Sequence, residues 1–156
     1  RFDAFEGTMV FDPANLEESW IKLRIPVASI DTGVAQRDAH LRSKDFFHAE
    51  KYPFITYESR KIVRTPGGAY VARGLLTIKD ITRKADIPFI YLGRVDNPNP
   101  KLGCTSIQGV EAAFDVNRLA FNVGDGSWYK KGMLGDTVQV HLAMEILTEI
   151  PGGDGK

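Results

Sequence analysis

Residues 136–146 read DTVQVHLAMEI, and from residue 138 onward every second side chain is a large apolar one. The apolar positions are Val138, Val140, Leu142, Met144 and Ile146. Successive side chains of a β-strand point to opposite faces, so this alternation predicts a strand with one buried face. A single strand cannot bury that face alone, and the stretch therefore predicts a sheet.

The same alternation recurs along the chain, at residues 20–30 (WIKLRIPVASI), 54–63 (FITYESRKIV) and 69–80 (AYVARGLLTIKD). Shorter examples cover residues 85–95 and 109–117, and glycine- or proline-rich turn sequences separate the runs. This rhythm predicts about eight antiparallel strands joined by short loops. Strands of this kind close into a barrel or stack as a sandwich, and the pattern leaves both open.

The domain organisation is simple. The only convincing helical stretch is a short segment around residues 36–50. We expect one domain over residues 1–150, and a flexible tail over residues 151–156, which read PGGDGK. Because the chain begins at Arg1 rather than Met, we expect that a leader or a larger parent sequence is absent from it.

Composition excludes several classes of protein. Twenty basic residues balance twenty acidic ones, so we expect no nucleic-acid partner. No run approaches the roughly 18 apolar residues of a membrane-spanning helix, so we expect no transmembrane segment. The single cysteine, Cys104, excludes a disulfide within the chain. A hydrophobic fraction of 43% is that of an ordinary globular domain.

Two candidate reactive sites lie in residues 37–53, RDAHLRSKDFFHAEKYP. Asp38, His40 and Ser43 are the residue types of a hydrolytic triad, but triads are assembled from distant positions and the G-x-S-x-G elbow is missing. His40 and His48 lack the cysteine pair or H-E-x-x-H spacing of a metal site. We therefore expect no enzyme activity and no metal, and interpret Arg37, Asp38 and His40 as a structural corner.

Six blocks of sequence resemble, in order, the YceI-like family of polyisoprenoid-binding proteins. They are VASIDTG (27–33), RDAHLRSKDFF (37–47), YPFITYES (52–59), RGLLTIKDITR (73–83), FDVNR (114–118) and LGDTVQV (134–140). The resemblance implies an all-β fold, an extended eight-stranded antiparallel lipocalin-like barrel with a short helical segment around residues 36–50. The chain departs from the family pattern at Asp80 and at residues 119–122, which read LAFN.

The resemblance also implies a function. Family members bind long-chain polyisoprenoid lipids in the barrel interior, which makes this chain a carrier, store or redox-related binding protein with a hydrophobic small molecule as its partner. We favour a prenylated quinone such as ubiquinone, because no cluster of Arg and Lys in the glycine-rich loops argues strongly for a diphosphate. Members are commonly exported bacterial proteins, so we expect a periplasmic or secreted location. The alternatives left open are a homodimer, and a protein- or carbohydrate-docking module of a multidomain secreted protein.

The alternation and the resemblance together give a set of candidate ligand contacts. Residues whose side chains should point inward and touch the lipid tail are Leu23, Ile25, Phe46, Phe47, Ile55, Tyr57, Leu76, Ile78, Phe89, Phe114, Val140, Leu142 and Met144. Residues expected to form a flap over the mouth are Trp128, Tyr129, Met133 and Leu134. Arg37 and His40 are expected to hold the corner or to meet the polar head group.

Overall fold

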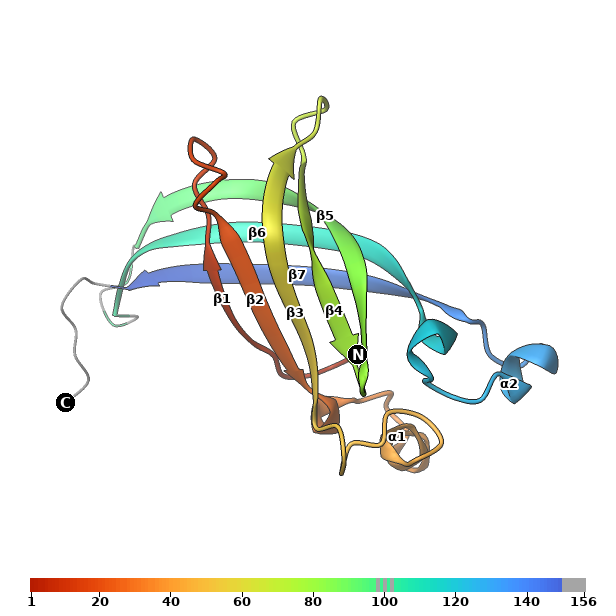
Figure 1. The fold of residues 1–156 in the computed structure, drawn as a ribbon. Helices are drawn as coiled ribbons and strands as arrows, with labels where there is room; N and C mark the ends of the chain where they lie inside the picture. Colours follow the sequence, from red (N-terminus) through yellow and green to blue (C-terminus); the bar gives the residue numbers. More distant parts are fainter. Residues whose placement is uncertain (98, 100, 102, 150–156) are drawn as a thin grey trace.

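The computed structural model describes residues 1–97, 99, 101 and 103–149, and these form one antiparallel sheet in which neighbours in the chain are neighbours in the sheet (Figure 1). The strands are β1 (Glu6–Val10), β2 (Trp20–Pro26), β3 (Phe54–Arg64), β4 (Tyr70–Ile78), β5 (Ile81–Asp96), β6 (Cys104–Asn117) and β7 (Thr137–Glu149). The sheet curls into a nearly closed barrel, so the predicted all-β class is confirmed.

The described part of the chain holds seven strands, one fewer than the eight predicted. The glycine-rich runs at residues 124–126 and 132–136 have the composition of turns between strands, but they flank the short helix α2 (Ser127–Lys130). The chain between β6 and β7 is therefore a long loop that also contains the 3-10 helix η3 (Arg118–Phe121).

The helical segment expected around residues 36–50 is shorter than predicted. After the 3-10 helix η1 (Val27–Ser29), helix α1 covers Ala35–Arg42 only. Ser43 ends the helix, because both its backbone N–H and its hydroxyl donate to the carbonyl oxygen of His40, at 3.1 and 2.7 Å. Residues 43–50 then form turns that lead into β3.

Three irregularities in strand register accompany the curvature of the sheet. They lie between Ser59 and Lys61 in β3, between Tyr91 and Gly93 in β5, and between Cys104 and Ser106 in β6. Such bulges increase local twist and bend a strand. The long strands β5, β6 and β7 consequently curve around the shorter ones, as Figure 1 shows.

The two ends of the strand order, β1 and β7, are the edges of the sheet. Every neighbouring pair is antiparallel, so β1 and β7, the first and last of seven strands, run in the same direction. No register pairs these two strands in the described part of the chain. We call the space between them the seam.

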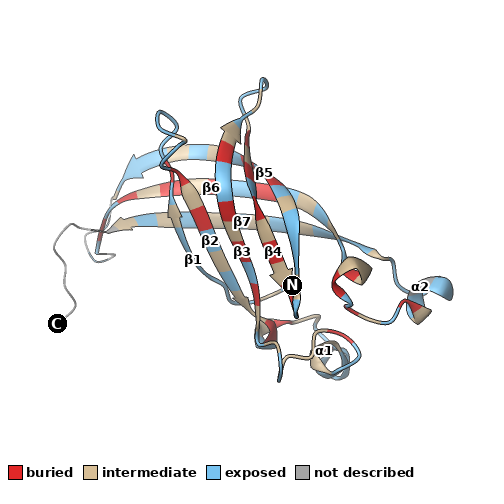
Figure 2. Cartoon of the chain, viewed as in Figure 1, coloured by how far each residue is buried: buried red, intermediate tan, exposed pale blue. Residues whose placement is uncertain are grey.

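Burial is unequal around the barrel (Figure 2). The inward positions of β3 and β4 are almost all fully buried, as are Ile87 and Phe89 of β5. Among the side chains described on β7, by contrast, the inward positions from Val140 to Ile146 are only half-buried. The core thus fills one side of the barrel more completely than the other.

Candidate ligand-binding interior

Rows of residues that lie directly opposite one another on neighbouring strands define the inner face of the barrel. Residues directly opposite each other in an antiparallel pair point to the same face. One row joins Leu23 of β2, Tyr57 of β3 and Leu76 of β4. The register of β4 to β7 builds a second row, which runs Tyr70, Phe89, Ala112 and Leu142. The predicted inward residues of these strands therefore do share one face.

An aromatic cluster fills the interior beside β4 and β5. Phe11, from the loop after β1, packs edge-on against Tyr70 and Phe89, with ring centroids 5.0 and 5.4 Å apart, and at a tilt against Tyr91 at 5.0 Å. Tyr70 and Phe89 stack on each other at 5.4 Å. Phe89, predicted as a ligand contact, is thus surrounded by the protein's own rings.

The side chain of Tyr57 is likewise engaged in contacts within the protein. Its hydroxyl donates to the carbonyl oxygen of Ala72 at 2.7 Å, and burial raises the pKa of this phenol. The ring reaches across Gly74, where a Cβ atom would lie 2.8 Å from the Tyr57 hydroxyl and 2.3 Å from the carbonyl oxygen of Glu58. The glycine is therefore required by close approach, and Tyr57 braces β3 against β4.

The other side of the inner face is apolar but incompletely covered. The half-buried residues predicted as contacts here are Leu23, Ile25, Phe114, Val140, Leu142 and Met144, from β2, β6 and β7. All of them except Val140 pack against the core without being enclosed by it. We call the aromatic side the packed half of the barrel, and the side built from these six residues the open half.

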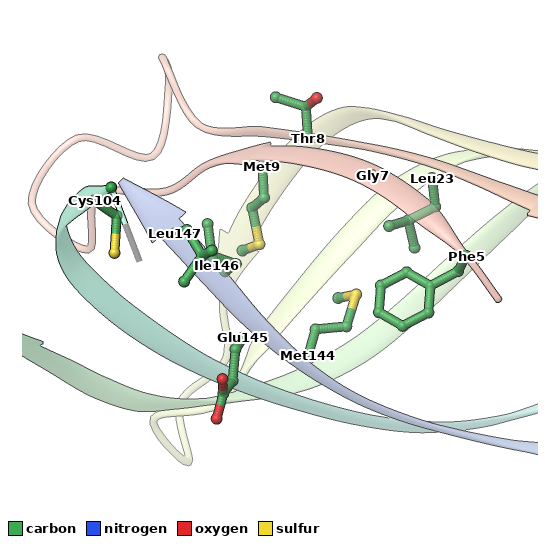
Figure 3. A pocket seen from close by; sticks show the side chains of 11 residues that line it. Phe5, Gly7, Thr8, Met9, Leu23, Cys104, Met144, Glu145, Ile146 and Leu147 are labelled. Carbon is green, nitrogen blue, oxygen red and sulfur yellow. The ribbon is translucent and has the colours of Figure 1, made fainter. Parts of the chain in front are cut away.

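The open half leads to a cavity of about 590 Å³ at the seam (Figure 3). Phe5 and Met9 from the β1 side, Leu23 from β2, and Met144 and Ile146 from β7 line it. Gly7 lets Leu23 lie against β1, because a Cβ there would come within 2.6 Å of Leu23 Cδ2. The cavity is of the size of small-molecule sites, and flexible methionine side chains adapt readily to an apolar guest.

The two phenylalanines of the corner lie at different depths. Phe46 is buried and packs edge-on against His40, with centroids 5.0 Å apart, and close to Gly124. Phe47 is half-buried and meets Phe2 at 6.0 Å. Ile55, Leu76 and Ile78 complete the buried contacts on β3 and β4. Phe46 therefore helps to close the end of the barrel beside α1.

The charged residues of the corner engage one another and the backbone. Asp38, buried in α1, accepts hydrogen bonds from the backbone and the hydroxyl of Thr32. Arg37 donates to the hydroxyl and the carbonyl oxygen of the same residue, at 2.8 and 2.7 Å. His40 Nε2 lies 3.3 Å from Asp45 Oδ2, and the Ser43 hydroxyl is bonded to the His40 backbone. The side chains of these three triad-type residues thus do not bond to one another.

The predicted flap residues lie in the loop that contains α2. Trp128 is 37% exposed, Leu134 42% and Met133 65%, so these side chains do not fold over the interior. The side chain of Tyr129 lies outside the described part of the structure. The loop is at the end of the molecule where α1 also lies, and Trp128 packs edge-on against His40 at 6.2 Å.

Several inner residues were missed from the sequence. Phe5, Met9 and Phe11 continue one period-two pattern at the start of the chain, which was the signal for β1. On β6, Ser106 and Gln108 are buried on the inner face. The Gln108 amide oxygen accepts from the Tyr91 hydroxyl at 3.2 Å, whereas the Ser106 hydroxyl, with 0% exposure, has no hydrogen-bond partner.

Residues 1–97, 99, 101 and 103–149 contain neither a cluster of metal-ligating side chains nor a helix that could span a membrane. In those ranges, no three His, Cys, Asp or Glu side chains gather in a way that could hold a metal ion. The helices found there are too short or too polar for any of them to cross a membrane.

Comparison with known proteins connects this geometry with a family. The family model for the YceI-like domain matches residues 1–146. The chain is 38% identical over 97 residues to a UPF0312 protein of Photorhabdus laumondii, covering 62% of this chain and 50% of the relative. It is 37% identical over 98 residues to a UPF0312 protein of Pseudomonas aeruginosa, covering 63% and 51%. The matches span about half the length of these relatives.

Solved structures share the fold. BcnA of Burkholderia cenocepacia superposes with a TM-score of 0.80 at 29% identity, covering 92% of this chain and 84% of BcnA. The YCEI protein of Campylobacter jejuni superposes with a TM-score of 0.82 at 23% identity, covering 96% and 84%. The second likeness shows the barrel alone.

Proposed function

This chain belongs to the YceI-like domain family of lipid- and isoprenoid-binding barrels, and on that premise we propose that it binds a long-chain polyisoprenoid lipid in its open half. The observation that carries the proposal is the half-buried apolar face of β2, β6 and β7. Apolar side chains that the protein itself does not enclose gain free energy when a guest covers them.

The energetics favour a slender hydrocarbon chain. An isoprene unit has five carbons, and burial contributes about 0.8 kcal/mol per methylene, so each unit supplies roughly 3 to 4 kcal/mol before costs. Three or four buried units therefore suffice for tight binding, and further units add less because the chain loses conformational freedom. Under this proposal the prenyl tail sets the affinity, and polar groups in the barrel interior select the head group of the lipid.

We propose a prenylated quinone such as ubiquinone as the ligand. Ser106, Gln108 and Tyr91 offer uncharged hydrogen-bonding groups on the inner face of β5 and β6. A buried hydroxyl without a partner can donate to a quinone carbonyl and thereby recover the free energy it lost on leaving water. Arg37, previously a candidate for the head group, is engaged with Thr32.

The eight-stranded form of the barrel is part of the same proposal. An antiparallel meander closes on itself only with an even number of strands, and one further extended segment could run antiparallel to both β1 and β7 across the seam. The inward side chains of Met9 and Met144 would still face the interior. Amide hydrogen exchange checks this point at the amides of residues 7–9 and 144–146 that point away from β2 and β6. Slow exchange at those amides is expected from a paired seam, and fast exchange contradicts it.

In its biological role, we propose that the protein is a carrier or store for the lipid in the periplasm or outside the cell. Withdrawal of the tail from water is what such a carrier must provide. A cell-fractionation experiment that finds the protein only in the cytoplasm would overturn the location.

Lipid extraction tests the proposed function. Protein purified from a bacterial host is extracted with organic solvent, and the extract is analysed by mass spectrometry; we expect a prenyl lipid, and tight rebinding of ubiquinone on add-back. Phe114→Asp places a charge in the open half and should abolish binding. Leu92→Asp, on the outer face of β5, is the matched control and should bind normally. No lipid in the extract together with no rebinding contradicts the proposal.

A second candidate, a protein-docking module, is favoured by an apolar row on the outer face. Val95, Ile107 and Leu147 lie directly opposite one another across β5, β6 and β7. Val95 and Leu147 are exposed, and Ile107 is half-buried. If Phe114→Asp abolished lipid binding while a partner protein still bound, and Val95→Asp had the reverse effect, docking would be the better account.

A further inference from the structure

The loop over residues 126–135, GSWYKKGMLG, presents apolar and basic side chains together. Trp128, Met133 and Leu134 are exposed large apolar residues within seven positions of one another, and Lys130 and Lys131 lie between them. The sequence has no acidic residue between Asp125 and Asp136. In Figures 1 and 2, α2 projects beyond the ends of β6 and β7. We call residues 126–135 the α2 loop.

The α2 loop is held in place by its backbone while its apolar side chains stay exposed. Arg118 is only 5% exposed, and its guanidinium donates to the carbonyl oxygens of Gly135 at 2.6 Å and Leu134 at 3.3 Å. Within the loop, the N–H groups of Met133 and Leu134 both donate to the carbonyl oxygen of Trp128. A buried arginine therefore fixes the base of the loop. Because the loop is already ordered, little conformational entropy is lost when its exposed apolar residues bind a partner.

We propose that the α2 loop docks on the surface of an anionic lipid bilayer, with Trp128, Met133 and Leu134 entering the boundary between head groups and acyl chains. Tryptophan is favoured at that boundary, and the lysines are attracted by anionic head groups. The combination of a few apolar residues with basic ones predicts weak, reversible and salt-sensitive binding.

The size of the surface favours a bilayer over a protein partner. A stable protein interface takes about 20 to 30 residues on each side, well beyond this loop. A bilayer needs only a tip that can be inserted, and its anionic head groups attract Lys130 and Lys131, whose acidic neighbour is Asp125 beside Lys131. This docking goes beyond the proposed lipid binding, and would take place whether or not the interior holds a ligand.

Vesicle cosedimentation tests the proposal on the whole chain. Vesicles of phosphatidylcholine alone are compared with vesicles that also contain phosphatidylglycerol, and we expect binding only to the second. With Trp20→Phe, the fluorescence of the remaining Trp128 should shift to the blue on binding. Added salt should release the protein, because the attraction between exposed charges is screened.

Matched variants distinguish docking by the α2 loop from nonspecific adsorption to vesicles. Lys130→Glu/Lys131→Glu should weaken binding by at least about fivefold for each lysine, whereas Lys61→Glu/Lys101→Glu, at exposed sites elsewhere, should have little effect. Met133→Ser should weaken binding strongly, and Leu92→Ser/Val95→Ser, on β5 with 60% exposure at both positions, should not. Circular dichroism and prenyl-lipid extraction show whether each variant is folded and loaded.

Two results would overturn the proposal. One is wild-type protein that binds neither kind of vesicle. The other is wild-type protein and folded α2-loop variants that bind anionic vesicles equally well, which would place docking elsewhere. Because lipid extraction is measured separately, either result leaves the proposed function of the interior to stand or fall on its own.

Discussion

The packed half and the open half of the barrel are built from the same alternation of apolar and polar residues, but their inward side chains differ in burial. In the packed half, Phe89 meets Phe11 and Tyr70, and Phe11 also meets Tyr91, so the aromatic ring from a loop fills the space inside the strands. In the open half, Phe114 and Met144 face the interior and remain half-buried. Alternation therefore specifies which side chains point inward, and whether they become core or binding surface depends on what lies opposite.

This difference also explains why the seam matters. Edge strands present unpaired backbone groups, and both edges of this sheet lie next to the cavity at the seam. The packed half provides a stable frame. A ligand can therefore enter or leave the open half without disturbing that frame. Substitutions in the two halves should accordingly separate stability from ligand binding.

The largest expected effect is at Phe89. Phe89→Ala should lower the free energy of unfolding by about 3 to 5 kcal/mol, because it leaves a cavity within the aromatic cluster. Phe114→Ala should cost much less stability and instead weaken binding of a prenyl lipid. Urea denaturation and lipid titration measure both quantities. Equal losses of stability at the two positions would erase the distinction between the halves.

Two glycines test the packing further, because a Cβ atom added at either would meet atoms of a neighbouring strand. Gly74→Ala places a Cβ 2.3 Å from the Glu58 carbonyl oxygen and 2.7 Å from Ser59 Cα, so overpacking should cost about 1 to 3 kcal/mol. Gly109→Ala is the control, because its Cβ would meet only the flexible side chain of Leu92, no closer than 3.2 Å. Denaturation midpoints should rank the variants in that order, and the reverse ranking would contradict the role given to Gly74.

Tyr57 gives a pH-dependent prediction for the packed half. Tyr57→Phe should cost about 0.5 to 1.5 kcal/mol by removing the bond to Ala72. Burial raises the pKa of Tyr57, so the neutral phenol is favoured in the folded state. The resulting stability is complete below the unfolded pKa of about 10 and is lost as the pH rises above it. The gap between wild type and variant in urea denaturation should therefore narrow above that pH; a constant gap would argue against a buried phenol.

The smallest expected effect on stability compares two buried serines. Ser59 accepts a hydrogen bond from the backbone of Ile21 at 2.8 Å, so Ser59→Ala should cost about 1 kcal/mol. Ser106 has no partner, so Ser106→Ala should be neutral or slightly stabilising while weakening ubiquinone binding. A large loss of stability from Ser106→Ala, measured by thermal unfolding, would mean that the hydroxyl is satisfied within the protein.

Much of the fold follows from local pattern. The inward phase of Tyr57, Phe89 and Leu142 was predicted from alternation and is confirmed by the cross-strand rows. The interaction of Phe11 with Tyr91 was not predictable, because it joins a loop to a strand far along the chain. The described residues hold seven of the eight predicted strands, and the glycines at residues 124–136, which typify turns, flank a helical turn.

The candidate site could be predicted only in part for a related reason. Alternation marks Phe89 and Phe114 alike as inward residues, and only the three-dimensional structure shows that Phe89 is enclosed and Phe114 is not. Likewise, the buried state of Arg118 depends on carbonyl groups from the loop that folds back over it. Such enclosure is a tertiary property and leaves no periodic signal in the sequence.

The chain's three methionines allow a direct test of the central claim, that the open half holds an apolar ligand. Met9 and Met144 line the cavity at the seam, whereas Met133 is exposed in the α2 loop. In NMR spectra of protein labelled with ¹³C at the methionine methyl groups, adding a ubiquinone in detergent should shift Met9 and Met144 and give contacts from both to the prenyl chain. Met133 should respond no more than it does to the detergent alone. Bound ubiquinone that leaves Met9 and Met144 unchanged would contradict the account.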